Sequence, residues 1–316
     1  MRVLLTLFAA LLMGSAVAAE RGPAVPDYPA DKVAAHTYVI HGPTGYPSAK
    51  NQGFMNNPAF IVTRDGIVVI DPGSTVQSGA MVLRQIRKLT DAPVVAVLNT
   101  HVHGDHWLGN QAIREAYPQV PIYGHPNMIA AIKQGAGISW VERMAQMTEG
   151  ASRGTGVVPP NHAVADGDTL AIGGITFRFH NFGTAHTNSD LMIEVPEEQA
   201  LFLADNVCNK RIVRMDDGKF SGSIATIDAA LKIPAKVLIP GHGRTGGWEI
   251  VHAYRDYLSG LYNAVDEYYQ QGIPDYAMKS KVAARLARFK DWPGFDDELG
   301  KHISLAYLEV EAKAFD

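Results

Sequence analysis

The sequence of 316 residues is 47% hydrophobic and 19% charged, a composition typical of a globular protein with a sizeable apolar core. Its formal net charge of −4 gives no overall attraction for a phosphate backbone, so we do not expect nucleic acid as a substrate or partner. A single cysteine, Cys208, excludes an intramolecular disulfide.

Residues 1–19 have the features of a secretory signal peptide. Met1 and Arg2 give a basic start, residues 3–13 form an apolar centre, and small residues lead to Ala19, near which cleavage is expected. The alternative, a membrane anchor, is disfavoured because a helix needs about 20 apolar residues to cross a bilayer. We therefore expect a periplasmic or secreted protein without a stable membrane anchor.

After an N-terminal segment, residues 20–36, the pattern predicts strands and then a helix. Residues 38–40, 59–63 and 67–70 are strand-like, and the last two segments are separated by a short turn. Apolar residues then recur at helical spacing over residues 76–86, which predicts a surface helix packed on a sheet.

A dense cluster of metal-binding side chains follows the next apolar strand, residues 93–98. Residues 100–106 read Thr-His-Val-His-Gly-Asp-His, and they include His101, His103, Asp105 and His106. Imidazole and carboxylate groups together suit zinc, and an extended loop can direct alternate side chains toward two different ions. We therefore expect half of a two-metal site at this strand end, where α/β folds expose their chemistry.

Three further candidate ligands occur at the ends of later strands. His186 follows residues 175–182, Asp205 ends the apolar run 200–204, and His242 follows residues 237–239. Because each of the three has an apolar strand before it and a turn signal beside it, we expect them to complete the metal site.

From residue 248 the pattern changes to long helical phrases. Tyr262, Tyr268 and Tyr269 form an aromatic stripe that could line a substrate pocket, although tyrosines at helical spacing favour packing. Residues 248–316 are therefore predicted to form a helical C-terminal extension, which could also support a homodimer.

These motifs resemble those of the metallo-β-lactamase superfamily over about residues 37–246. The resemblance implies an α/β fold, the αββα four-layer sandwich, with residues 37–247 as the catalytic domain. It further implies one metal ion held by three histidines, a second held by a mixed set, a bridging carboxylate, and an outer carboxylate that orients the ligand loop. The implied assignments are His101, His103 and His186 for the first ion, Asp105, His106 and His242 for the second, Asp205 as the bridge and Asp71 as the outer carboxylate.

The same resemblance implies a hydrolase with two zinc ions, which iron or manganese could replace. The ions would lower the pKa of bound water from about 15.7 toward 7, and Asp105 could orient the resulting hydroxide or pass a proton. Asp205 stands near the position of a cysteine in the commonest zinc β-lactamases, whereas glyoxalase II has the full His/Asp set. A small thioester or ester is therefore the expected substrate, and Cys208 is interpreted as a structural thiol.

Two other activities remain open by resemblance. A periplasmic β-lactamase agrees with the export signal, although Asp205 and the lack of a clear carboxylate-binding lysine motif argue against it. A mononuclear iron persulfide dioxygenase shares the His-x-His motif and the later histidine and aspartate. A purely structural zinc site is disfavoured, since such sites close with four ligands.

Two loops, residues 42–58 and residues 150–161, are expected to shape substrate choice. The loop 42–58 is rich in Gly, Pro and Asn and carries the apolar Phe54 and Met55, so it could be a mobile flap or an ordinary surface turn. Three basic residues soon after Asp205 could receive an anionic group of the substrate or could be solvated surface charges: Lys210, Arg211 and Arg214.

Overall fold

The computed structural model describes residues 20–315, and its first sheet contains seven strands. Strands β1 to β4 pair antiparallel, whereas β4 to β7 pair parallel. In spatial order the strands are β1 (Ala30–Lys32), β2 (Thr37–Ile40), β3 (Ala59–Val62), β4 (Ile67–Ile70), β5 (Val94–Leu98), β6 (Ile122–Gly124) and β7 (His162–Ala163).

The second sheet contains five strands in the order β12-β11-β10-β9-β8. Only the β11–β12 pair is parallel within this sheet. The strands are β8 (Thr169–Ile172), β9 (Ile175–His180), β10 (Met192–Val195), β11 (Ala200–Ala204) and β12 (Val237–Pro240). In both sheets the parallel strands are joined through helices, as parallel pairing requires.

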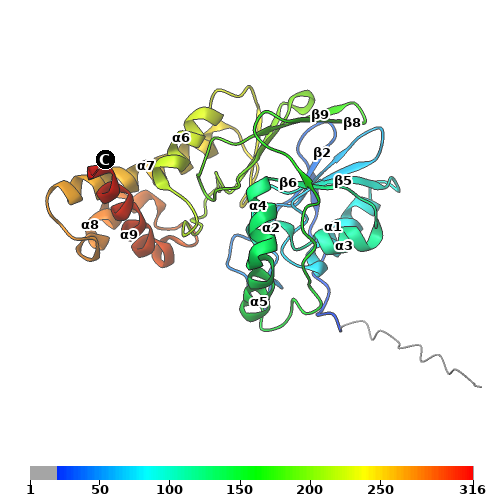
Figure 1. Ribbon diagram of the computed structural model, residues 1–316, viewed down its shortest axis with the longest axis horizontal. Coiled ribbons are helices and arrows are strands. Elements are labelled where there is room, and N and C mark those ends of the chain that lie inside the picture. The colour runs from blue at the N-terminus through cyan, green and yellow to red at the C-terminus, as the bar shows by residue number, and fades with distance from the viewer. Residues whose placement is uncertain (1–19, 316) are drawn as a thin grey trace, which may run out of the picture.

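Helices cover the outer face of each sheet (Figure 1). On the first sheet α1 and α3 pack together, and α6 to α9 lie on the side of the second sheet. The α-helices are α1 (Val76–Arg87), α2 (Gly104–Trp107), α3 (Asn110–Ala116), α4 (Pro126–Ala131), α5 (Gly137–Met147), α6 (Phe220–Ala230), α7 (Trp248–Gln270), α8 (Lys279–Arg285) and α9 (Phe295–Ala314). A π-helical turn, Ile132–Ala136, joins α4 to α5.

Side-chain alternation along the strands builds separate cores on the two faces of the first sheet. In β4, Val68 and Ile70 point into the core between the sheets, whereas Ile67 and Val69 point toward α1 and α3. Because successive strand residues face opposite sides, an all-apolar strand must be covered on both. The expected αββα sandwich is thereby confirmed.

The structure extends one of the expected boundaries. Residues 30–32 pair with β2, so the first sheet begins before residue 37. The predicted signal peptide, residues 1–19, lies outside the described residues. Within residues 20–315, no helix has the length and apolar character needed to cross a membrane.

The C-terminal helices share a core with the second sheet. Tyr254 and Leu258 of α7 and Ile303 of α9 are buried in the same cluster as Leu201 of β11 and Leu238 of β12. The extension is therefore part of the fourth layer. The tyrosines of the predicted stripe are partly buried against this core, as expected for packing.

Buried His302 in α9 predicts a loss of stability in acid. Burial lowers the pKa of His302 from 6.5 to about 4, and its Nδ1 lies 2.9 Å from the Tyr257 hydroxyl oxygen. The contribution of neutral His302 is full above pH 6.5 and is lost as the pH falls toward 4, because only the unfolded chain is readily protonated. Between pH 7 and pH 4, we expect the wild type to lose about 3 kcal/mol more unfolding free energy than His302→Gln.

Urea unfolding at a series of pH values measures this difference. The control is His252→Gln, which changes an exposed histidine of α7. This variant should lose as much unfolding free energy between pH 7 and pH 4 as the wild type does. If His302→Gln lost as much unfolding free energy between pH 7 and pH 4 as the wild type, buried His302 would not be the cause of the acid sensitivity.

Candidate metal centre

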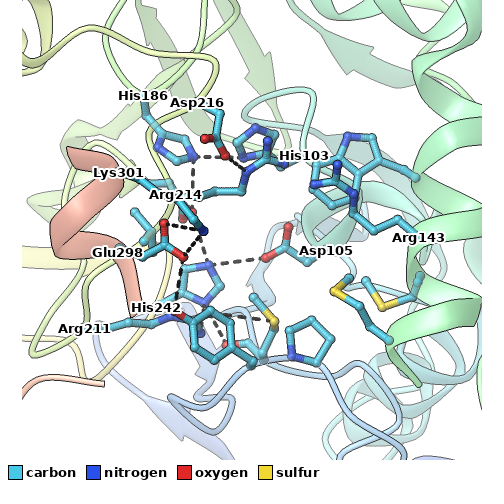
Figure 2. A pocket seen from close by; sticks show the side chains of 18 residues that line it. His103, Asp105, Arg143, His186, Arg211, Arg214, Asp216, His242, Glu298 and Lys301 are labelled. Carbon is cyan, nitrogen blue, oxygen red and sulfur yellow. Dashed lines mark hydrogen bonds and ion pairs between the residues drawn. The ribbon is translucent and has the colours of Figure 1, made fainter. Parts of the chain in front are cut away.

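The ends of strands from both sheets bring the expected metal ligands together. His101 to His106 lie between β5 and the end of α2, His186 follows β9, Asp205 follows β11, and His242 follows β12. Figure 2 shows His103, Asp105, His186 and His242 around one pocket. Since the parallel strands end at the same edge of each sheet, residues far apart in sequence meet there.

Three groups of side chains have ligand atoms close enough to share an ion. Within each group these atoms lie within 4.8 Å of one another, and every residue is buried. The groups are His101, His103 and His186; His101, His106 and Asp205; and Asp105, His106 and His242. The first and third are the two ligand sets implied by the sequence.

Asp205 lies between those two sets. One carboxylate oxygen is 3.2 Å from His106 Nε2, and the other is 3.2 Å from His242 Nε2 and 3.6 Å from His186 Nε2. Asp205 therefore contacts residues of both groups, as a bridging carboxylate must.

The donor atoms fit a metal ion. His101 Nε2, His106 Nε2 and Asp205 Oδ1 are buried and have no hydrogen-bond partner among residues 20–315. Buried polar atoms are costly to leave unpaired, so a cluster of them pointing at one region indicates a ligand. Nitrogen and carboxylate donors in this combination suit zinc, and iron or manganese less specifically.

Hydrogen bonds behind the ligands hold the imidazole rings. Asp71 Oδ2 lies 2.8 Å from His106 Nδ1, which leaves His106 Nε2 directed at the centre. The Thr100 backbone N–H and hydroxyl donate to the same carboxylate at 2.9 and 2.6 Å. Asp71 has φ +48°, a strained backbone that these bonds stabilise. Asp71 thus lies where an orienting carboxylate is needed.

Asp217 has the same relation to His103, which sequence reasoning missed. Its Oδ2 lies 2.9 Å from His103 Nε2, and His103 Nδ1 faces His186 Nε2 at 2.9 Å. The pKa of Asp217 is lowered to about 2, chiefly by the hydrogen bond from His103. Each ring nitrogen of His103 therefore has its own partner: Nε2 faces Asp217, and Nδ1 faces His186 at the candidate metal centre.

The buried charges favour a cation at the centre. Burial opposes ionisation of Asp205, yet His242 and His106 hold the pKa of its carboxyl well below the ordinary value. Burial also lowers the pKa of His101, and that of His186 to about 3, so both rings are neutral and able to ligate. Despite their burial, His106 and His242 have pKa values raised by Asp205, so the negative charge of this carboxylate is balanced by positive charge at these two rings, where a bound cation would supply it instead.

Replacing Asp71 by asparagine should weaken metal binding without removing a ligand. The amide has the size of the carboxylate but loses its charge and one acceptor, so His106 is held less firmly. We expect the affinity for zinc to fall about 10- to 100-fold, measured by competition with a chromogenic chelator. Asp291→Asn, at an exposed position, is the control; unchanged affinity in Asp71→Asn would show that the bond does not orient His106.

A cavity of about 270 Å³ opens over the ligands. One part of its wall is apolar, with Tyr46, Pro47, Met55, Trp140, Met144, Met147 and Val213. The charged residues of the wall are Arg143, Arg211, Arg214, Asp216, Glu298 and Lys301. A substrate at the ligands would therefore meet both apolar surface and positive charge.

The expected substrate contacts are only partly placed at this cavity. Arg211 lines it and is buried. Phe54 does not: its side chain is fully buried in the core beside Tyr28, with ring centroids 4.8 Å apart, and the neighbouring Met55 lines the cavity instead. Lys210 is exposed outside the lining. The predictions for Phe54 and Lys210 were therefore wrong. Both residues lie in irregular loops, where no sequence periodicity indicates which way a side chain points.

The C-terminal helices contribute to the cavity through charged residues rather than tyrosines. Glu298 and Lys301 of α9 line the wall, and Lys301 Nζ lies 3.2 Å from Glu298 Oε1. Tyr46 donates from its hydroxyl to the same oxygen at 3.3 Å. Helix α9 is therefore a wall of the pocket.

Comparison with known proteins identifies one family for most of the chain. The family model described as metallo-beta-lactamase superfamily matches residues 52–242. A linear primary-alkylsulfatase of a Pseudomonas species is 22% identical over 71% of this chain and 50% of its own length. A metallo-beta-lactamase type 2 of Bacteroides fragilis is 24% identical over 46% of this chain and 61% of its own. A hydroxyacylglutathione hydrolase of a Nostoc species is 33% identical over 25% and 32%.

Solved structures share the fold. A metallo-beta-lactamase from Pontibacter korlensis aligns with a TM-score of 0.60 and 20% identity, covering 73% of this chain and 98% of that one. The sec-alkylsulfatase Pisa1 from Pseudomonas sp. aligns with a TM-score of 0.66 and 18% identity, covering 89% of this chain and 50% of that one. The chain thus spans about half the length of the alkylsulfatases it matches.

Proposed function

Because the chain belongs to the metallo-beta-lactamase superfamily, we propose that it is a dinuclear zinc hydrolase that cleaves a thioester, an ester or a related carbonyl bond of a small molecule. The observation that carries this proposal is Asp205, which contacts the ligands of both groups. With two ions bound, the Asp205 carboxylate would be a ligand available to both of them.

The side chains divide the chemical work between them. Two zinc ions at these residues would supply Lewis acidity and acidify a water molecule. His101, His103 and His186 would hold one ion, and Asp105, His106 and His242 would hold the other.

Asp105 and Arg211 have further roles at the same centre. Burial raises the pKa of Asp105, but His106 and His242 outweigh it and keep the carboxylate ionised. Asp105 can therefore orient a water molecule or accept its proton. Arg211 is buried with no carboxylate within 4.0 Å in the described chain, so it can receive negative charge of the substrate.

β-Lactam hydrolysis is a second candidate. The Bacteroides fragilis relative is named for that activity, and buried Arg211 could pair with the carboxylate of a lactam. The thioester is preferred because the commonest zinc β-lactamases have a cysteine near the position of Asp205. Cys208, the only cysteine of the chain, is instead buried in the core shared with the C-terminal helices and does not line the cavity. A persulfide dioxygenase would require a single iron.

The first test is turnover by the zinc-loaded protein. We expect hydrolysis of a glutathione thioester, loss of activity on chelation and recovery with zinc. Cleavage of a chromogenic cephalosporin alone would favour the lactamase, and sulfate release from dodecyl sulfate would place the activity with the alkylsulfatase relative. Oxygen consumption with a persulfide and one bound iron would contradict a hydrolase.

We further propose that the protein is exported as a small-molecule hydrolase to the periplasm or outside the cell. The support is the amino-acid pattern of residues 1–19. Mass spectrometry of the protein from a periplasmic fraction should give a mature N-terminus near Ala19 or Glu20. A homodimer through the C-terminal helices stays a prediction, to be tested by light scattering.

A further inference from the structure

The catalytic cavity adjoins a second, smaller one at a tryptophan and two arginines. The second cavity measures about 160 Å³ and shares Trp140, Arg143 and Arg214 with the first. Its remaining lining includes Ser139 and Asp217. The space available to a ligand therefore continues past these three residues, and Asp217, which lies 2.9 Å from His103 Nε2, lines the second cavity.

Both arginines lie over the same indole ring. The guanidinium carbon of Arg143 is 5.2 Å from the centre of the Trp140 ring, and that of Arg214 is 5.7 Å from it. The face of an indole ring is electron-rich and attracts cations, so the Trp140 ring stabilises both guanidinium groups in these positions. Trp140 therefore places two guanidinium groups at one part of the wall, where either could donate to an anion.

The two arginines differ in their acidic partners. Arg214 pairs with Asp216 at 2.8 Å and with Asp217 at 3.5 Å, which fixes its position. Arg143 has no carboxylate within 4.0 Å anywhere in residues 20–315. It presents an exposed, uncompensated charge at the place where the two cavities meet.

Apolar surface lies between this charge and the metal ligands. The Trp140 ring centre lies 5.2 Å from that of His103 and 5.2 Å from the Arg143 guanidinium, and Met144 and Met147 of the same helix also line the main cavity. Figure 2 shows Arg143 across the pocket from His242. Arg211, in contrast, lies beside His242, 3.1 Å from its Nδ1. Arg143 and Arg211 therefore lie on opposite sides of a pocket whose wall also contains apolar side chains.

We propose that Trp140, Arg143 and Arg214 form a subsite for a terminal oxyanion of the substrate, joined by an apolar segment to the bond that is cleaved. This inference rests on the proposed hydrolase function and narrows its substrate class to amphiphilic anions. Planar guanidinium groups bind a carboxylate through paired hydrogen bonds, so a carboxylate serves as the probe.

A matched pair of esters tests the subsite. Mono-p-nitrophenyl adipate and p-nitrophenyl hexanoate have the same leaving group and acyl length, and only the first has a terminal carboxylate. We expect the zinc-loaded wild type to favour the adipate ester in kcat/KM, and Arg143→Met to lower that preference about 3- to 10-fold. Lys133→Met, an equal loss of charge at an exposed residue of the adjoining π-helical turn, should keep it.

An unchanged preference in Arg143→Met would overturn the subsite even though both esters are hydrolysed. Failure to hydrolyse either ester would contradict the proposed function instead, and the subsite is then judged by binding. Calorimetry with adipate should give an affinity about 3- to 10-fold weaker for Arg143→Met than for the wild type and Lys133→Met. Equal affinities in all three proteins would refute the subsite.

Discussion

Replacing Asp205 by asparagine is expected to lower kcat by at least about 1000-fold, or about 4 kcal/mol of activation free energy. Asp205 is only 4% exposed and contacts His106, His186 and His242, so in the proposed centre it would be shared by both metal positions. An amide has the same shape but one neutral oxygen in place of a shared negative charge. The two ions would then repel one another without a bridge.

Steady-state kinetics and metal content of the purified variant measure this effect. Circular dichroism should show that the fold survives, because Asp205 lies at a strand end rather than in an apolar core. Asp91→Asn changes an exposed aspartate and should behave as the wild type. An Asp205→Asn protein with two ions and the wild-type rate would disprove the bridging role.

A single methyl group at Gly241 should damage the same centre. A Cβ added there would lie 1.9 Å from Asp205 Oδ1 and 2.8 Å from the carbonyl carbon of Ala204. Gly241 has no positive φ, so the effect of alanine is purely steric. Since neither the strand backbone nor the bridging carboxylate can move freely, we expect Gly241→Ala to lose about 1–3 kcal/mol of unfolding free energy. Asp205 would be displaced, and zinc binding with it.

Gly45→Ala provides the matched control. An added Cβ at Gly45 meets no described atom within 4 Å, so stability and zinc content should equal those of the wild type. Chemical unfolding of the metal-free proteins isolates the steric effect, and titration with zinc reports the displaced ligand. Normal zinc affinity in Gly241→Ala would mean that Asp205 is not held where the structure places it.

The grouping of the candidate metal ligands was predictable because each of them comes after a strand in the sequence. Apolar strands are recognisable in the amino-acid sequence, and the carboxyl ends of parallel strands meet at one edge of a sheet. His101, Asp205 and His242 could therefore be grouped by the strands that precede them. The four layers follow from the same periodicities. Asp217, in contrast, lies in a turn before α6 with no strand leading to it, and nothing local marks it as a partner of His103.

The substrate wall was the least predictable part. Glu298 and Lys301 reach the cavity only because α9 packs across α7 and the second sheet, a tertiary contact without a local signal. Phe54 and Met55 are neighbours in an irregular loop, and the path of the loop backbone buries Phe54 in the core and turns Met55 toward the cavity. In the sequence Arg143 is one charge on an amphipathic helix, and only its position over Trp140 suggests recognition.

The measurement that tests the central claim most directly is the metal content of the mature protein by inductively coupled plasma mass spectrometry, before and after titration with zinc. We predict two equivalents of zinc in the wild type, with hydrolytic activity rising to its maximum as the second ion binds. In Asp205→Asn the second equivalent should be lost. A protein that is fully active with one metal ion, or that holds a single iron, would contradict the dinuclear hydrolase.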